Sequence, residues 1–494
     1  MVFYSQSPFG MINTWNTRYE KNLKKESVCM EIVAIVLSLF LLVTFAYKGF
    51  SVILFAPIFA LFAASFSGLP ILPGYTELFM AKAVTYIKSF FPVFLLGAVF
   101  GKVMEETGMA RSIAMKTIQL IGKDRAVFAV VFACMILCYG GISMFVCAFA
   151  VYPFAAALFR EADIPKHLIP ACFVAGVFTA TMDCYPGSPQ IQNIIPTIYL
   201  GTTTFAAPIL GLICGTLLIV LCLAYLEWRR KIFKKNGEGY GNHTVNETVI
   251  DPNAKLPPWQ LSIVPLIVVL AMNFYFSMVF QWDNALLAPF KAMNLPLVAK
   301  DVHNVVAIWA LVLGLLAAII IACITGKKFL SKNTSVKAAL NAGALGSLLA
   351  IMNTASEVGY GNVISSLPGF LEVADALLGI GDGMPLFNVA LMVNILAGIT
   401  GSASGGLSIA LDIFGNHFLA ETAAVGIPPE VVHRIAAMAS GGMDSLPHNG
   451  AVITTLAICG LTHKEAYKDM FAITLLKVVV AFFAVFFYML TGIC

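Results

Sequence analysis

Two copies of one polar motif interrupt long apolar stretches of this sequence, and they constrain the fold more than any other feature. The pattern Met-Asp-x-x-Pro occurs at residues 182–186 and again at residues 443–447. Each copy follows an Ile-Pro pair and, further upstream, an apolar stretch with a glycine-rich break, in the same order and at nearly the same spacing. Landmarks that recur in this way indicate an internal duplication. We therefore predict two halves of one architecture that meet at the two aspartate loops.

The composition places the chain in a membrane. Of its 494 residues, 59% are hydrophobic and only 11% are charged, whereas a soluble protein carries about 25% charged residues. Apolar runs of about 20 residues recur, which is the length that a helix needs to cross the hydrocarbon core. Lipid offers no hydrogen-bond partners to the backbone, and the runs lack the alternation of a β-barrel. The predicted fold class is an all-α polytopic membrane protein whose first partner is the lipid bilayer.

The cysteines give no sign of a metal site or a disulfide framework. All 11 are scattered, and none forms a Cys-x-x-Cys pair, so we expect small core side chains. The sequence predicts no cofactor, no metal, no nucleic-acid partner and no enzymatic activity.

The apolar runs and hydrophilic stretches predict the domain organisation. Residues 1–29 form a polar N-terminal arm, and residues 229–258 form a hydrophilic cytoplasmic linker between two repeats at 30–228 and 259–494. Each repeat is expected to contain five transmembrane helices, one of them broken, and a re-entrant helical hairpin. The expected scaffold, hairpin and broken helix lie at 30–104, 126–160 and 166–200 in the first repeat, and at 259–357, 385–422 and 429–458 in the second.

The basic residues predict that the second repeat is inverted. Lys and Arg favour the cytoplasmic side of a membrane. If each hairpin enters and leaves on one face, each half crosses five times, and most of the 30 Lys and Arg fall in cytoplasmic loops. The external connections after residue 29 then contain only Lys291 and Lys300. The N-terminal arm is the exception, because its basic residues would lie outside the cell. The expected location is the inner, cytoplasmic membrane.

Four breaks interrupt the expected membrane segments, and they predict a transport site. Backbone that is not helical cannot face lipid, and breaks at corresponding positions of inverted halves indicate the binding site of a transporter. The half-helix after each break presents free N–H groups, which suit a carboxylate, and the freed carbonyls suit Na⁺ or a proton path. Close helix packing by small residues is the alternative. The predicted substrate-binding residues are Gly140, Gly141, Ser143, Ser188, Gln190, Ser402, Ser404, Gly405, Gly406, His448 and Asn449.

Asp183 and Asp444 are the strongest candidates for ion or proton coupling. A carboxylate inside a membrane is costly and is a functional candidate by default. Capping of the broken helices is the alternative role. His448 has no counterpart in the first half; its imidazole titrates near neutral pH and could carry a coupled proton or bind a carboxylate, whereas a neutral, hydrogen-bonded imidazole is the alternative.

The other charged residues of the apolar segments are expected to reach water. Lys477 is predicted to extend its ammonium group to the membrane interface. Glu357 is predicted to be solvated at a helix end. Asp412 is expected either to face a solvated cleft or to take part in coupling. The remaining histidines are expected in loops or at the interface.

The order of hairpin, Ile-Pro and broken helix resembles that of the ion transporter superfamily. Within it, residues 401–411 (GSASGGLSIAL) and 439–454 (ASGGMDSLPHNGAVIT) resemble the gluconate permease (GntP) family, and look closest to its D-β-hydroxybutyrate permeases. The resemblance covers most of residues 30–494 and is most specific in the second half. The loop Met-Asp-Ser-Leu-Pro-His-Asn differs from the His-Val-Asn-Asp-Ser of the gluconate branch, which disfavours gluconate itself as the substrate.

The resemblance implies a function and a mechanism. It implies proton-coupled uptake of a small hydroxycarboxylate such as D-3-hydroxybutyrate, a homodimer, and an elevator motion of the broken elements against the scaffold. A sodium-coupled carboxylate symporter and a gluconate or sugar-acid permease are the alternatives. An anion channel and an intramembrane aspartyl protease, suggested by the Gly-Ile-Gly-Asp at residues 379–382, are remote ones.

Overall fold

The computed structural model describes most of the chain. The described residues are 28–45, 48, 50–142, 144–243, 246, 255–294, 301–330, 334–381, 383–447 and 449–494. Nearly all of the predicted polar arm lies outside them, as do Ser143, Asp382 and His448.

Every regular element in the described ranges is helical, which confirms the predicted all-α fold class. Seven helices of this part of the chain are long and apolar enough to cross a membrane. They are Val28–Phe45, Ile71–Glu106, Pro208–Lys235, Trp259–Val279, Val306–Phe329, Val336–Ser365 and His463–Thr491.

The first half begins with the helix Val28–Phe45. It continues through α2 (Val52–Phe66), α3 (Ile71–Pro73), the π-helical turn η1 (Gly74–Met80), α4 (Ala81–Glu106), α5 (Met109–Ile121), α6 (Ala126–Tyr139), α7 (Met144–Glu161), α8 (Ile169–Val177), α9 (Ala180–Asp183), α10 (Ile191–Leu200) and α11 (Pro208–Lys235). Short 3-10 turns lie at Lys123–Arg125 and Lys166–Leu168.

The second half follows the same order. It contains α12 (Trp259–Phe274), the π-helical turn η4 (Tyr275–Val279), α13 (Ala288–Ala292), α14 (Val306–Gly326), α15 (Val336–Ser365), α16 (Pro368–Ile380), α17 (Pro385–Thr400), α18 (Ala403–Ala424), α19 (Pro429–Ser440), α20 (Gly450–Cys459) and α21 (His463–Thr491). Its 3-10 turns lie at Asn284–Leu287, Val302–Asn304 and Lys327–Phe329. Each half therefore contains, in this order, a long helix, a helix of 13 residues, a hairpin, a broken helix and a final long helix.

The two long helices α4 and α15 pack against each other in opposite directions. Gly343, near the start of α15, lies against the backbone of Val99 near the end of α4, and Gly359 lies against Phe79 near the other end. A side chain on either glycine would collide with the neighbouring backbone, so these glycines permit the close approach. Equivalent helices of an inverted repeat run in opposite directions, and α4 and α15 meet this condition. The boundaries of the repeats and the sides of the membrane stay predictions.

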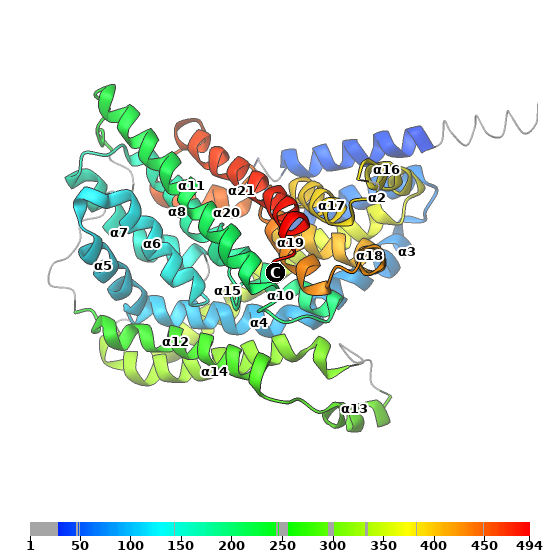
Figure 1. The fold of residues 1–494 in the computed structure, drawn as a ribbon, viewed down its shortest axis with the longest axis horizontal. Helices are drawn as coiled ribbons and strands as arrows, with labels where there is room; N and C mark the ends of the chain where they lie inside the picture. The colour runs from blue at the N-terminus through cyan, green and yellow to red at the C-terminus, as the bar shows by residue number, and fades with distance from the viewer. Residues whose placement is uncertain are drawn as a thin grey trace, which may run out of the picture.

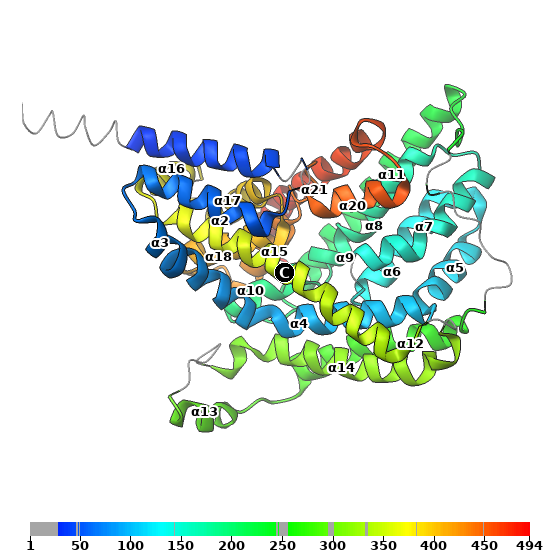
Figure 2. The ribbon, with the colours of Figure 1, turned by 180° about the vertical axis from the view of Figure 1, so that it is seen from behind.

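The two halves interlock at the centre of the molecule. In Figures 1 and 2, the hairpins α6–α7 and α17–α18 lie on opposite sides of a central region that contains α10 and α19. The helix α10, which ends the first broken segment, packs against α18 and α19 of the second half. Correspondingly, α20 packs against α7 and α8 of the first half. Each broken helix therefore ends against the hairpin of the other half.

Several predicted boundaries are wrong by a turn or more. The helix α15 continues to Ser365, beyond the expected end of the scaffold at residue 357, and α11 continues to Lys235 inside the expected linker. The glycine-rich run at residues 398–406 predicts an interruption of the second hairpin with the next half-helix beginning at about Gly405, and the observed break is shorter. Only Gly401, with a φ of 64°, and Ser402 separate its helices. Gly406 lies within α18, and this position needs a glycine because a side chain there would overlap the backbone of Ala397 on α17.

The predicted inversion can be tested with single cysteines. Asn236 follows α11 and Lys328 follows α14, both are exposed, and both lie in Lys-rich connections that the inverted topology places inside the cell. With the exposed native Cys29 replaced by Ser, Asn236→Cys and Lys328→Cys should react with a membrane-impermeant maleimide only from the cytoplasmic side. Lys291→Cys is the matched control and should react from outside. External labelling at position 236 or 328 in intact cells would contradict the inversion.

Candidate functional site

The first aspartate loop is tied to the tip of the first hairpin. The chain turns between α6 and α7 through Gly141, whose φ is 92°. The Tyr139 hydroxyl donates to the Pro186 carbonyl at 2.6 Å. The Gln190 side-chain amide donates to the Cys138 carbonyl at 2.7 Å. The Cys138 carbonyl at the break of the hairpin thus accepts from the loop that carries Asp183, and the hairpin in turn donates to a carbonyl of that loop.

The second aspartate loop is tied to the second hairpin in the same way. The Asn449 amide donates to the Gly401 carbonyl at 2.7 Å. The Asn449 Oδ1 also caps α20 by accepting from the Ala451 N–H at 2.7 Å. Ser402 caps α18, because its Oγ accepts from the Gly405 N–H at 3.2 Å. Gln190 and Asn449 therefore take equivalent positions, each at the end of an aspartate loop with its amide on the tip of a hairpin.

The two aspartate loops touch each other at Gly441. A side chain on this glycine would overlap the Asp183 Oδ2, and it would also lie 3.1 Å from the Lys477 Cε. The second aspartate loop also contacts the second hairpin. Its Met443 side chain lies against Gly398, in the last turn of α17 before the break at Gly401 and Ser402. The described parts of all four breaks therefore form one connected region, as the sequence predicted, while their roles in binding stay predictions.

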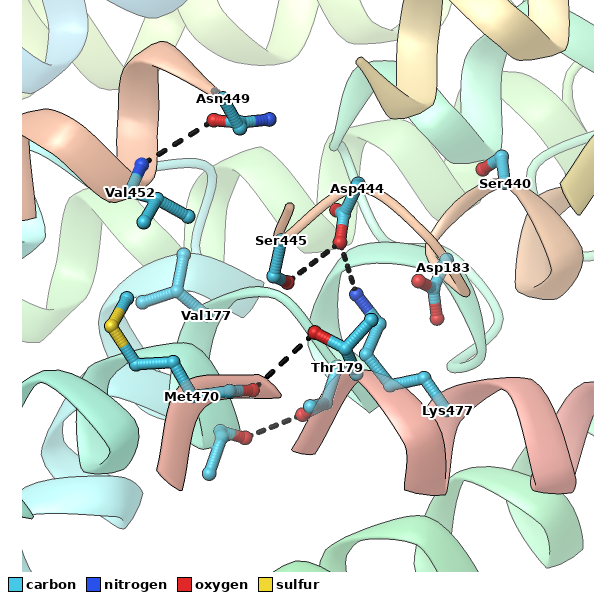
Figure 3. A network of polar contacts seen from close by, with 12 residues as sticks. Val177, Thr179, Asp183, Ser440, Asp444, Ser445, Asn449, Val452, Met470 and Lys477 are labelled. Carbon is cyan, nitrogen blue, oxygen red and sulfur yellow. Dashed lines mark hydrogen bonds and ion pairs between the residues drawn. The ribbon is translucent and has the colours of Figure 1, made fainter. Parts of the chain in front are cut away.

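Asp444 forms a buried ion pair with Lys477, which Figure 3 shows at the centre of the contact. The Lys477 Nζ lies 2.7 Å from the Asp444 Oδ1, and each side chain is at most 2% exposed. The Ser445 hydroxyl donates to the same oxygen at 2.9 Å. The expectation that Lys477 extends to the membrane interface is therefore wrong, because a buried carboxylate offers its ammonium group a stronger partner. Asn449, not Asp444, caps the helix that follows.

Asp183 lies beside this pair but has fewer partners (Figure 3). Its side chain is 1% exposed. The Asp183 Oδ1 accepts from the Cys184 thiol at 3.1 Å. The Asp183 Oδ2 is buried and has no hydrogen-bond partner among the described residues. Asp183 therefore does not cap the next helix either, and its Oδ2 is a buried oxygen without a partner among the described residues at the contact between the loops.

A fully buried arginine on α19 joins the halves, and the sequence analysis missed it. The Arg434 guanidinium is 0% exposed, and every hydrogen bond found for it goes to an uncharged oxygen. It donates to the Ala206 carbonyl at 2.8 and 3.1 Å, to the Asp183 carbonyl at 3.1 Å, to the Asn193 Oδ1 at 2.9 Å and to the Thr204 carbonyl at 3.4 Å. An arginine within an apolar broken segment was the signal that could have identified it.

His433, next to Arg434, was expected in a loop or at the interface, and this expectation is wrong. Its imidazole is 0% exposed. The ring nitrogens lie 2.6 Å from the Thr202 hydroxyl and 3.2 Å from the Asn193 Oδ1. Asn193 on α10 thus binds both His433 and Arg434, and it holds the end of the first broken helix against α19.

Glu357 is not solvated at a helix end as predicted. It lies within α15, and its Oε2 is buried without a hydrogen-bond partner among the described residues. The same oxygen lies against Gly405 in the first turn of α18, where a side chain would meet it at 2.6 Å. The helix N-terminus that the sequence assigned to a substrate carboxylate thus already faces a carboxylate of the protein, which the helix dipole stabilises.

Asp412 and the remaining predicted binding residues make separate contacts and do not join the Asp444–Lys477 pair. Asp412 on α18 pairs with Lys82 on α4 at 2.8 Å, and both side chains are partly exposed. The fully buried Ser188 donates its hydroxyl to the Thr181 carbonyl at 2.5 Å. Gly140 packs against Leu266 on α12, so close packing explains this glycine. Ser404 lies 3.4 Å from Ser402 at the start of α18. Ser143 and His448 lie outside the described residues.

Two cavities lie near the hairpins. One of about 360 Å³ is lined by Tyr139, Gly187 and Phe205 together with residues of α12. The other, of about 140 Å³, is apolar and lies between the helix Val28–Phe45 and α15–α18. Neither of these two cavities is lined by Asp183 or Asp444. No group of three or more His, Cys, Asp or Glu that could hold a metal ion occurs in the part of the chain that the structure describes.

Comparison with known proteins decides the family. The family model described as GntP family permease matches residues 27–490. The chain belongs to the GntP permease family. This permease is 45% identical over 476 residues to the uncharacterized transporter YxjC of Bacillus subtilis, a match that covers 94% of this chain and 100% of the relative. An uncharacterized transporter of Haemophilus influenzae is 24% identical over 379 residues, which covers 76% of this chain and 78% of that protein.

A solved structure shares the fold. The crystal structure of the Alcanivorax borkumensis YdaH transporter superposes with a TM-score of 0.54 at 16% identity, covering 84% of this chain and 88% of that one. At this identity the likeness shows the fold alone. The family and the apolar helices together make this permease a multi-pass membrane protein and a secondary transporter, not an enzyme.

Proposed function

We propose that this permease is a proton symporter of a small hydroxycarboxylate such as D-3-hydroxybutyrate, in the cytoplasmic membrane of the cell. The family makes it a secondary transporter, and the proposal adds the substrate, the coupling ion and the mechanism. The single observation that carries it is the buried group of Asp183, Asp444 and Lys477 at the contact between the two aspartate loops.

A structural role alone explains this group poorly. Burying an ion pair inside a membrane protein is costly, and apolar side chains of similar volume would give equal or greater stability. The pair lies where broken segments from both halves meet, which is where transporters with inverted repeats bind substrate and ions. The unused Asp183 oxygen gives a place for a proton, and sodium is the alternative occupant because a carboxylate oxygen suits it equally well.

The substrate carboxylate is expected to bind to backbone and amide groups at the breaks. The half-helices α10 and α20 begin directly after the aspartate loops, at Ile191 and Gly450, and the N-terminus of a helix attracts a carboxylate. On α20 the substrate would replace the Asn449 Oδ1 as the acceptor of the first N–H groups. Gln190 and Asn449 precede these helices and keep the hairpin tips in place. A hydroxyl group on the substrate adds hydrogen bonds that a plain fatty acid lacks, which is how such a site would select a hydroxy acid.

An elevator motion fits the division of the molecule. The antiparallel pair α4 and α15 would form part of a static scaffold, in a homodimer, and the hairpins and broken helices would move as a unit. The Lys82–Asp412 pair joins α4 to α18. It is partly exposed, so breaking and re-forming it during a motion would cost little.

Uptake into proteoliposomes tests the proposal. Purified permease should accumulate labelled D-3-hydroxybutyrate against its gradient when an inward proton gradient is imposed, and uptake should saturate, which a channel would not give. Labelled gluconate and lactate under the same gradient define the substrate class, and an inward Na⁺ gradient without a proton gradient is the matched control. Accumulation driven by Na⁺ alone would overturn proton coupling, and transport of none of the three acids would overturn the substrate class.

A further inference from the structure

The charges buried at the contact between the aspartate loops balance. In the described part of this region, two carboxylates, Asp183 and Asp444, face two cations, Lys477 and Arg434. The imidazole of His433 is bound between a hydroxyl and an amide oxygen, as a neutral ring would be. With both carboxylates ionised, the group has no net charge, which is the state that a low-dielectric interior tolerates best.

The two carboxylates are not equivalent. Asp444 receives the Lys477 ammonium at 2.7 Å and the Ser445 hydroxyl at 2.9 Å. Asp183 receives only a thiol, a weak donor, on one oxygen, and its other oxygen has no partner among the described residues. A proton on the Asp183 Oδ2 therefore breaks no ion pair, whereas a proton on Asp444 would remove the charge that pairs with Lys477.

We infer that Asp183 alone carries the coupled proton, that the proton binds before the substrate, and that the cargo is a monovalent carboxylate moved without net charge transfer. This inference rests on the proposed function and assigns roles within its site. The Asp183 carboxylate takes a proton from the outer solution, and an O–H bond forms on its free oxygen. The cluster then has one excess positive charge, shared by Lys477 and Arg434, and a single carboxylate restores neutrality.

The charged and titratable groups around Asp183 determine whether its carboxylate is ionised. Cys184 lies in the same loop, Cys138 on α6, Arg434 on α19, Asp444 in the second aspartate loop and Lys477 on α21. Lys477 and Arg434 stabilise the ionised form of Asp183. After Asp183 is protonated, Asp444 is the remaining anion of the cluster, so the two cations attract an incoming carboxylate, and the buried site screens this attraction weakly.

Equal charge in the empty and loaded states has a physical consequence. The empty, ionised cluster and the cluster with one proton and one monoanion have the same net charge. Both can therefore move through the bilayer without the penalty of carrying an uncompensated charge. A state with the proton but no substrate, or with substrate but no proton, is charged and moves slowly, and this difference couples the two fluxes.

The variant Asp183→Asn tests the inference because it imitates the protonated carboxyl group. In proteoliposomes it should exchange labelled for unlabelled D-3-hydroxybutyrate at a rate that does not change between about pH 6 and pH 8. It should show no accumulation under a proton gradient. Asp444→Asn should lose both exchange and accumulation, because it removes the partner of Lys477. Glu227→Gln, which removes a partly exposed pair with Arg230 far along α11 from the cluster, is the matched control and should keep proton-driven accumulation.

Two measurements on the unaltered permease test the same inference if Asp183→Asn fails to fold. Initial uptake under a fixed proton gradient should change less than about twofold when a K⁺ diffusion potential is imposed with valinomycin, since no net charge moves. Succinate, a dianion, should neither be accumulated nor compete. Proton-driven accumulation by Asp183→Asn, or uptake that follows the membrane potential, would overturn the inference while leaving proton symport intact. Absence of proton-driven uptake in the unaltered permease would instead overturn the proposed function.

Discussion

Lys477→Met should abolish uptake and lower the stability of the permease. The substitution keeps the volume of the side chain but leaves the Asp444 carboxylate buried, 2% exposed, with the Ser445 hydroxyl as the remaining side-chain donor among the described residues. Breaking a buried ion pair by removal of one partner costs about 3–5 kcal/mol. Thermal unfolding of the purified protein in detergent, followed by the loss of monodisperse material in size-exclusion chromatography, measures the effect on stability, and uptake in proteoliposomes measures the effect on function.

A double variant separates the two effects. Lys477→Met combined with Asp444→Asn removes both charges, and it should recover most of the lost thermal stability because no uncompensated charge remains buried. Uptake should stay absent, since the proposed cation for the substrate is gone. Lys82→Met is the matched control, because its partner Asp412 is partly exposed and loss of that pair costs little. Wild-type uptake in the double variant would remove the Asp444–Lys477 pair from the transport mechanism.

Arg434→Met should destabilise the permease more than any substitution of a surface arginine. The guanidinium is fully buried, and its loss leaves the carbonyls of Ala206 and Asp183 without the donor that the structure gives them. The Asn193 Oδ1 and the Thr204 carbonyl keep other donors. An unsatisfied buried polar group costs about 1–3 kcal/mol, so the sum over the Ala206 and Asp183 carbonyls is a large part of the stability of a typical protein. The same thermal assay should show a strong decrease in the unfolding temperature, and transport should fall to background.

Two further arginine variants show whether geometry or charge is responsible. Arg434→Lys keeps the charge but cannot bind several carbonyls at once, because an ammonium group lacks the planar fork of a guanidinium. It should therefore remain markedly destabilised. Arg230→Met, which removes a partly exposed pair with Glu227 on the same helix, is the matched control and should change the unfolding temperature little. Full stability of Arg434→Met would show that the 201–207 segment and α19 are held together by other contacts.

The polar breaks were predictable because they are local. Glycine, proline and a capping side chain end a membrane helix through backbone conformation and hydrogen bonding within a few residues. Asp183, Asp444 and the small residues of the hairpin tips could therefore be placed at breaks from the sequence, and so could the all-α class, which follows from apolar length. The extent of a break was less predictable. Residues 398–406 were predicted to interrupt the second hairpin, with the next half-helix beginning at about Gly405, whereas α17 continues to Thr400 and α18 begins at Ala403.

The sequence by itself determined that this chain crosses the membrane as helices, that it repeats one order of elements, and that two aspartates lie at interruptions of those helices. Only the tertiary structure decided which charges meet. Lys477 lies 33 positions from Asp444 in the chain and Arg434 lies 251 positions from Asp183, and nothing in their local sequence distinguishes a buried partner from a side chain that reaches the interface. The physical reason is that helix termini and apolar spans depend on neighbouring residues, whereas the energy of a buried charge depends on whichever distant groups the fold places beside it.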